Sequence, residues 1–358
     1  MNTRSPNILS LDPWSASSLV QKGIRRGDAT TAQVAAEMLF RYRGPAVWKR
    51  LLVIAAEDVG IGSLDVVMQV ACAAARHKAD QQSLAAVFDA VRLLADSPKN
   101  REAEHLITIA AQHPDLKMLR ERLRNASTTD RIAIALDPTQ QLTSRAVATW
   151  FSSGLNSYGE RVCGRPDLPS LMAGFSEAGL PDELTSTLLP AARSVREPMI
   201  VMLPLLFLAV LGAKEVLGLR QAEVPHSPVC QGIPLYAFDK HTATGKAALA
   251  LFLRQNSDVR ECLLEHAPEF RIRNLVEIAA FYVEGNAVSL EASWKGSHAL
   301  KAKGIESALM WQGCSPSGVR PTLDVVRANL DHLNDIRHKL LSARFVNRQL
   351  ALPLEMQS

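Results

Sequence analysis

The sequence lacks the motif that would assign it at once to the ATP-hydrolysing enzymes. No G-x-x-x-x-G-K-[ST] phosphate loop occurs in its 358 residues. The nearest approach, KHTATGKA, has Lys240 where the first glycine belongs and Ala247 where the magnesium-binding hydroxyl belongs. Both departures remove groups that hold nucleotide phosphates, so the sequence excludes nucleotide hydrolysis at this loop.

Close cysteine pairs are also missing, and aromatic residues make up only 5% of the chain. The five cysteines have neither zinc-site spacing nor the spacing of a redox couple: Cys72, Cys163, Cys230, Cys262 and Cys314. We therefore expect no metal site and no cofactor. The N-terminal stretch MNTRSPNILSLDPWS has no apolar run of signal-peptide type, which favours a reducing, cytoplasmic location.

No apolar run reaches the length of a membrane span. The longest, PMIVMLPLLFLAVLGA at 198–213, is shorter than the roughly 20 residues that cross a bilayer. We predict a buried core helix in which Pro204 causes a kink or marks the first turn. A membrane-associated protein that uses this segment remains an alternative.

The residues that are present indicate an all-α protein. Hydrophobic residues make up 47% of the chain, the net charge is +4, and apolar residues recur with a period of 3.6. The pattern predicts helices at 46–57, 64–76, 82–95, 101–111, 246–255 and 271–283, and one long helix after Pro321. We place a domain boundary near residue 125, which gives a stacked helical domain at 1–125 and a second mainly helical region at 126–358.

The stretch LLVIAAEDVGIGS, at 51–63, admits two interpretations. A strand that ends in an acidic pair would suit a magnesium-binding ATPase, but only with a phosphate loop upstream. As a helix, the stretch ends at Gly60 in a left-handed conformation. A buried carboxylate near a helix C-terminus is unfavourable unless it is paired, so we expect Asp58 or Glu57 to contact a basic side chain or backbone donors.

Three motifs in order carry a resemblance to a known family. Arg26-Gly27-Asp28, the run from Lys49-Arg50-Leu51 to Glu57-Asp58-Val59-Gly60, and Ser97-Pro98-Lys99-Asn100 follow the course of the C-terminal helical domain of the RarA/MgsA (Werner-helicase-interacting) ATPases. The resemblance covers about residues 15–110, and the family's ATPase module has no counterpart here. It implies a clamp-loader-like fold, a homo-oligomer and proximity to replication-fork DNA, without ATP hydrolysis.

Several basic and aromatic side chains are candidates for DNA binding. Cations on the first helices suit phosphate contacts, the lysines of the 239–246 loop flank a helix start, and a tryptophan beside a lysine is typical of single-strand binding. The candidates are Arg25, Arg26, Lys49, Arg50, Lys240, Lys246, Trp294 and Lys295. Solvated helix faces and a tryptophan in the core are the simpler alternatives.

The loop DKHTATGK also admits a catalytic interpretation. Asp239 and His241 would form an acid/base couple in an enzyme that acts on a phosphorylated or nucleic-acid substrate. Such a site requires Asp239, Lys240, His241 and Lys246 to converge with Trp294 or His298. The simpler alternative is a capping loop, in which Thr242 or Thr244 caps the next helix.

The C-terminal QLALPL, at 349–354, resembles sliding-clamp-binding peptides. Gln349, Leu352 and Leu354 would dock on the clamp. Our leading hypothesis is a non-enzymatic accessory protein of DNA replication, recombination or repair. It would bind DNA or replication proteins such as the sliding clamp or single-strand-binding protein.

Overall fold

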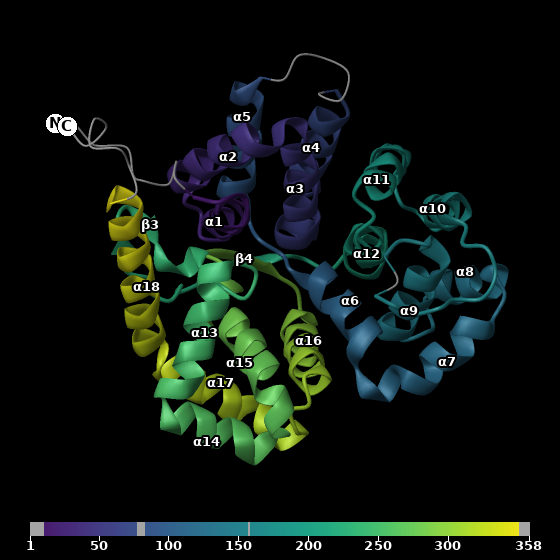
Figure 1. Ribbon diagram of the computed structural model, residues 1–358. Coiled ribbons are helices and arrows are strands. Elements are labelled where there is room, and N and C mark those ends of the chain that lie inside the picture. The colour runs from purple at the N-terminus through teal and green to yellow at the C-terminus, as the bar shows by residue number, and fades with distance from the viewer. Residues whose placement is uncertain (1–10, 77–82, 157, 351–358) are drawn as a thin grey trace. The chain divides into compact units, whose positions relative to one another are not determined.

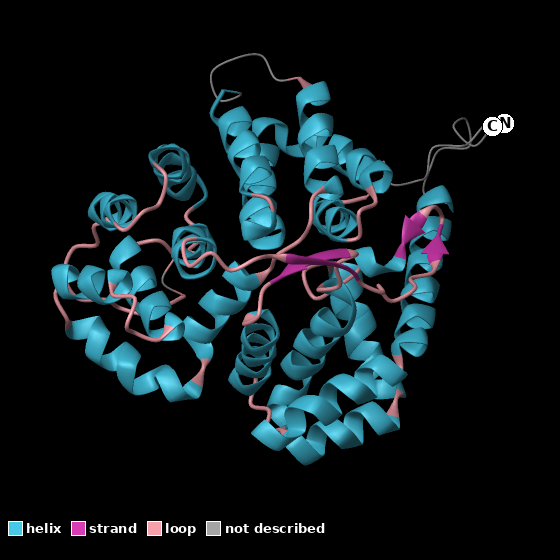
Figure 2. Ribbon diagram, turned by 180° about the vertical axis from the view of Figure 1, so that it is seen from behind, coloured by secondary structure: helices cyan, strands magenta, loops and turns pink. Residues whose placement is uncertain are grey.

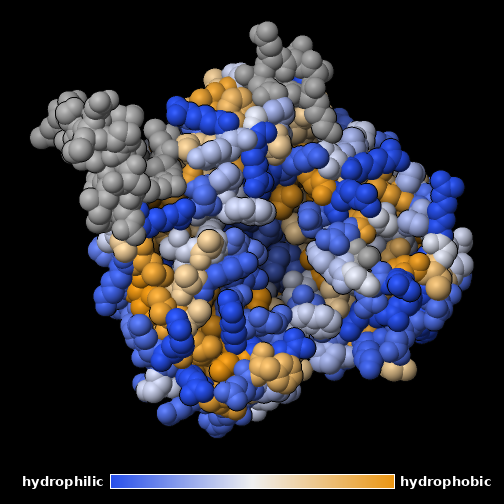
Figure 3. Space-filling model, in the orientation of Figure 1, coloured by the Kyte–Doolittle hydropathy of each residue, from blue (hydrophilic) through white to orange (hydrophobic). Residues whose placement is uncertain are grey.

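The protein is predominantly helical, which confirms the all-α prediction (Figures 1 and 2). This computed structural model describes residues 11–76, 83–156 and 158–350, with side chains as far as residue 344. Hydrophilic side chains cover much of the face in Figure 3, and hydrophobic ones appear there in separate groups.

The chain forms two compact units, each assembled from separate stretches of sequence. Unit 1 contains Met1–Tyr42, Val224–Ala287 and Gln312–Ser358, and unit 2 contains Arg43–Glu223 and Val288–Trp311. Neither unit coincides with the segments 1–125 and 126–358 that the sequence predicts. Asn125 lies inside unit 2, at the end of a helix.

Unit 1 is built from helices at both ends of the chain and a middle segment. Its helices are α1 (Pro13–Arg25), α2 (Ala29–Arg43), α13 (Ala243–Gln255), α14 (Ser257–His266), α15 (Ile272–Ala280), α17 (Val319–Ala328) and α18 (Leu330–Leu350). The hairpin of β2 (Val229–Cys230) and β3 (Ile233–Pro234) belongs to the same unit. Helix α13 packs on α15 and α18, and α14 packs on α17, so the middle segment forms a core with the C-terminal helices.

Unit 2 contains most of the remaining helices. They are α3 (Val47–Ile54), α4 (Leu64–Arg76), α5 (Leu84–Asp96), α6 (Glu102–Gln112), α7 (Lys117–Asn125), α8 (Thr128–Leu136), α9 (Leu142–Ser153), α10 (Leu168–Glu177), α11 (Asp182–Val195), α12 (Met199–Leu206) and α16 (Ser297–Trp311). Figure 1 shows α6 beside α16, two helices that are far apart in sequence and pack together.

Two short strands of unit 2 form an antiparallel pair. Strand β1 (Gly218–Gln221) pairs with β4 (Leu290–Ser293), and Gly218 lies opposite Ser293. The backbone of Lys99 extends this ladder, because its N–H donates to Leu290 O and its carbonyl accepts from Ala292 N, both at 2.8 Å. This backbone ladder connects the segment after α5 to a strand almost 200 residues later.

The first half of the apolar run at 198–213 is a buried helix, as predicted. All eight residues of α12 are buried, and the π-type turn Phe207–Leu211 continues it. Pro204 lies inside α12, where it leaves one backbone carbonyl without its usual intrahelical donor. No helix in the described part of the chain is long and apolar enough to cross a membrane.

The C-terminal helix differs from the prediction. One helix is expected after Pro321, but the structure has α17, which begins before that proline, and then α18. Asn329 lies at the break and bonds to Val325 O (2.9 Å) through its amide, while its side-chain oxygen accepts from Asn256 (2.8 Å). Because Asn256 is distant in sequence, periodicity could not indicate the break.

Candidate functional site

The acidic pair of the LLVIAAEDVGIGS stretch lies at a helix end and not on a strand. Helix α3 passes into the π-type turn Ala55–Val59, where Asp58 is fully buried. The guanidinium of Arg101 donates to Asp58 and, at 3.1 Å, to Glu57. The expected pairing with a basic side chain is therefore confirmed, and the magnesium-ligand interpretation has no free carboxylate at Asp58.

Glycine at position 60 is required by both conformation and space. Gly60 has the expected positive φ (+52°), but its ψ of −138° is not that of the predicted left-handed helical conformation, and a Cβ there would lie 2.5 Å from Asn100 O. The N–H of Asn100 donates to Asp58 O at 2.9 Å. The segments Glu57–Gly60 and Ser97–Arg101 thus form one buried contact, which we call the helix-end joint.

Lys99 is part of the helix-end joint and is not available to a phosphate. Its side chain is buried, and its ammonium donates to Ala95 O (2.9 Å) and Ser97 O. Burial lowers the pKa of Lys99 to about 8, although the charge of Asp58 opposes this shift. The motif lysine is therefore an architectural residue.

The side chain of Trp294 is half-buried and hydrogen-bonded within unit 2. Its indole N–H donates to the carboxylate of Glu102, which also accepts from Ser297. Burial raises the pKa of Glu102, and these hydrogen bonds oppose that rise. A Cβ at Gly296 would overlap the indole ring, so the chain itself covers one face of Trp294.

The next residue, Lys295, is exposed. Because Gly296 covers one face of the Trp294 indole, a nucleic-acid base could stack only on the other face. Lys295 stays a candidate for contact with a phosphate.

The basic residues of the first helices are placed very differently from one another. Arg25 is only 2% exposed and donates to Gly285 O at 2.6 Å. Arg26 is half-buried, donates to Pro225 O at 2.8 Å and lies 4.3 Å from the centre of the Tyr236 ring. We therefore remove Arg25 from the DNA-binding candidates, because core packing and a backbone carbonyl occupy its guanidinium.

Lys49 and Arg50 are adjacent on α3 of unit 2 but differ in exposure. Lys49 is exposed, whereas Arg50 is half-buried. Arg50 lies near Glu197, whose pKa is raised by burial and by Glu57 and lowered by the charge of Arg50. Lys49 is thus the more accessible of the two to a polyanion.

The loop at 239–246 is a capping loop in unit 1. Thr242 is the N-cap of α13, with its hydroxyl accepting from Gly245 N at 3.0 Å, as predicted. A Cβ at Gly245 would overlap the carbonyl oxygen of Asp239, which explains this glycine. Lys246 is exposed on the first turn of α13 and stays a candidate for anion contact.

Asp239 forms a buried ion pair in place of an acid/base couple. One carboxylate oxygen lies 2.7 Å from the ammonium of Lys22, and the other accepts from His241 N at 2.9 Å. Burial alone would raise the pKa of Asp239, but Lys22 and the hydrogen bonds lower it to about 2. Burial lowers the pKa of Lys22 to about 8 against the opposing charge of Asp239.

Two side chains next to Asp239 contact Phe281 in unit 1, although His241 is exposed. The ring of Phe281 contacts His241 edge-on and has the ammonium of Lys240 5.2 Å from its centre. Trp294 and His298 belong to unit 2. Because Asp239 is buried and its carboxylate is paired with Lys22, the catalytic hypothesis loses its base.

Part of the predicted clamp-binding peptide falls outside the described residues. Gln349 lies in the last turn of α18, where the structure does not describe its side chain. Leu352 and Leu354 lie beyond the described residues. The described residues contain no group of three or more His, Cys, Asp or Glu side chains that could hold a metal ion.

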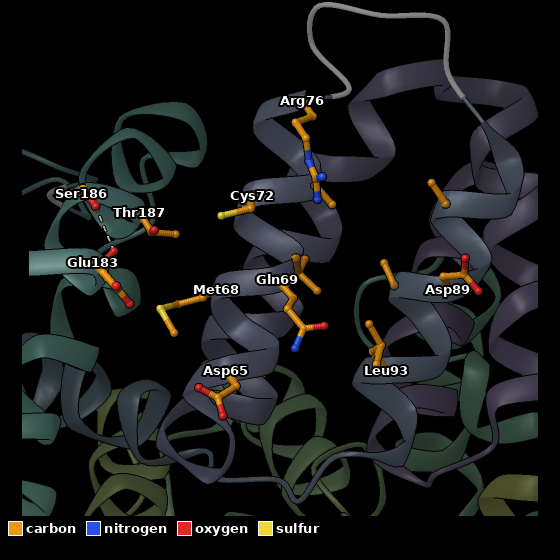
Figure 4. A pocket seen from close by; sticks show the side chains of 14 residues that line it. Asp65, Met68, Gln69, Cys72, Arg76, Asp89, Leu93, Glu183, Ser186 and Thr187 are labelled. Atoms are coloured by element: carbon orange, nitrogen blue, oxygen red, sulfur yellow. Dashed lines mark hydrogen bonds between the residues drawn. The ribbon is translucent and has the colours of Figure 1, made fainter. Parts of the chain in front are cut away.

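A groove in unit 2 was not predicted from the sequence. It lies along α4, α5 and α11, and its volume is about 980 Å³. In Figure 4, Met68 and Cys72 of α4 point toward α11, from which Glu183 and Thr187 face them. A signal for this groove exists in the sequence, because Asp65, Met68, Cys72 and Arg76 follow the spacing of one helix face.

Comparisons with family models, with curated proteins and with solved structures gave no match to this chain.

Proposed function

We propose that this protein is a non-enzymatic accessory protein of DNA replication, recombination or repair, which binds DNA and protein partners. The observation that carries this proposal is the helix-end joint. Two segments on which the RarA/MgsA resemblance rests, Glu57–Gly60 and Ser97–Asn100, meet there in one buried contact. If the chain shared the fold of that domain, these two segments would be expected to pack together. Chance matches of two short segments would not require them to be in contact.

The proposed DNA contact uses exposed cations and no buried ones. Lys49 and Lys295 are exposed in unit 2, and Lys246 is exposed in unit 1. Lysines of this kind neutralise phosphates and release counterions without reading base sequence. Homo-oligomer formation, a cytoplasmic location and clamp docking through Gln349, Leu352 and Leu354 are further parts of the proposal, supported by the sequence.

Replacing the two exposed lysines of unit 2 tests this proposal. We expect Lys49→Ala/Lys295→Ala to weaken binding of the full chain to single-stranded, duplex and forked DNA alike. Each lost phosphate contact should reduce the slope of log K against log salt by about 0.9 for duplex DNA and about 0.7 for single strands. Fluorescence anisotropy across a salt series measures both quantities.

Arg320→Ala/Lys339→Ala is the matched control, because both of these cations are exposed in unit 1 and are not among the candidates. The control should keep the wild-type slope. An equal loss of slope in both variants would mean that charge in general, and not the candidate lysines, attracts DNA. That result would contradict the assignment of Lys49 and Lys295.

A further inference from the structure

The groove along α4, α5 and α11 combines an apolar floor with acidic edges. Val70 and Ala90 are buried in the floor, and the half-buried Met68 and Leu93 flank them. Most of the other lining side chains are exposed or half-buried, so the groove is open to solvent. An open surface of this kind suits a macromolecular segment better than an enclosed small molecule.

Helix α4 is organised to present two different faces. Val67, Val70, Ala71 and Ala74 form its buried side. The groove side carries Asp65, Met68, Gln69, Cys72 and Arg76. The last four follow Asp65 by three, four, seven and eleven positions, which is the spacing of one helix face. An amphipathic helix that exposes a methionine and a cysteine between polar residues has unburied apolar surface along its outer side.

Charge in the groove is predominantly negative. Asp65 and Glu183 form no salt bridge with any residue that the structure describes, and Asp89 pairs at 3.6 Å with Arg92, where both side chains are exposed. Among the lining residues that the structure describes, the one cation is Arg76, the last residue of α4. Such a surface repels phosphates and attracts cationic side chains.

We infer that this groove binds a cationic amphipathic helix of a protein partner. Apolar side chains at positions i, i+3, i+4 and i+7 of that helix would cover Met68 and Leu93. Lysines or arginines along its edges would face Asp65 and Glu183. Because α4 is 13 residues long, the occupant would need about 20 Å of helix, or roughly 13 residues.

This inference rests on the proposed role in protein binding and is independent of DNA contact. The acids of the groove oppose DNA, so DNA and the helical partner would use different surfaces. The salt-series experiment can therefore fail while the groove still binds its partner, and the reverse also holds.

Cys72 provides a local reporter for the test. It is exposed in the groove, and Cys163 is exposed outside it. The probe is a synthetic Leu/Lys peptide of helical periodicity, with a scrambled peptide of the same composition and a Leu/Glu peptide as controls. Maleimide labelling of the full chain, mapped by mass spectrometry, gives the reaction rate of each cysteine.

We expect the Leu/Lys peptide to slow maleimide labelling of Cys72 and to leave the labelling rate of Cys163 unchanged. Neither control peptide should slow the labelling of Cys72. Asp65→Asn/Glu183→Gln should weaken peptide binding about tenfold, because two exposed charge pairs with the peptide are lost. Asp258→Asn/Asp331→Asn is the control, since these acids also lie in first helical turns but outside the groove. It should leave the affinity unchanged.

Three results would overturn the inference. The first is no protection of Cys72 at peptide concentrations of about 1 mM, where even a weak complex forms. The second is equal protection by the scrambled or acidic peptide. The third is self-association of the free protein that Asp65→Asn/Glu183→Gln abolishes, because the occupant would then be a second copy of this chain.

Discussion

At the scale of single residues, burial decides which charged side chains remain available. The sequence offers Arg25 and Asp239 as candidate site residues, yet both are buried in unit 1, as is Lys22. Lys22 and Asp239 satisfy each other at 2.7 Å, and breaking such a pair leaves an uncompensated buried charge. Their role is therefore in the stability of unit 1.

The Lys22–Asp239 pair should make stability depend on acid pH. The pKa of Asp239 is about 2 in the folded chain, below its ordinary 3.8, so the unfolded chain takes up the proton first as the pH falls. This stabilisation is complete above about pH 4, and about 2 kcal/mol is lost as the pH falls toward 2. Urea unfolding at several pH values measures this loss.

Asp239→Asn is the reference, because it retains every other titrating carboxylate. Its free energy of unfolding should be lower at neutral pH and should fall less steeply below pH 4 than that of the wild type. Parallel pH dependences in the two proteins would show that Asp239 does not titrate with a lowered pKa.

At the scale of helices and strands, the regular helices could be predicted from the sequence, whereas helix breaks and the packing of one helix on another could not. The apolar period placed the helix at 64–76 correctly, because Val67, Val70 and Ala74 repeat at helical spacing on its buried face. The break at Asn329 was not predicted, and the Asn256 side chain that bonds to Asn329 there is distant in sequence. The groove face of α4 was equally visible in the spacing, but only the structure places α11 beside it.

The helix-end joint can be tested at Gly60. Gly60→Ala should destabilise the protein by about 3 kcal/mol, since the new Cβ meets Asn100 O in a backbone conformation with positive φ. Gly159→Ala is the control, because Gly159 also has a positive φ (+87°) but no atom within 4 Å of its would-be Cβ. There we expect about 1 kcal/mol, the cost of the backbone conformation alone.

Chemical denaturation of both variants measures how much more the substitution costs at Gly60, where the Asn100 contact is close, than at Gly159. Equal losses at Gly60 and Gly159 would mean that the close approach of Asn100 adds nothing. The helix-end joint would then be less tightly packed than the structure indicates.

At the scale of the whole molecule, the two compact units cannot be recognised from the order of the sequence, because each is made of separate stretches. The first helices of the sequence belong with residues more than 200 positions later, as the bond from Arg25 to Gly285 O shows. A composition shift near residue 125 could not reveal such pairing. For the same reason, a basic helix at the N-terminus predicted exposed cations, whereas the structure retains only some of them at the surface.

The most direct measurement of the proposed function is a titration of fluorescent forked DNA with the unsubstituted chain at low ionic strength, repeated as salt is raised. We expect saturable binding in which log K falls linearly with log salt, because exposed lysines displace counterions from phosphates. Absence of binding at low salt, or binding that does not change with salt, would contradict the proposed role at DNA.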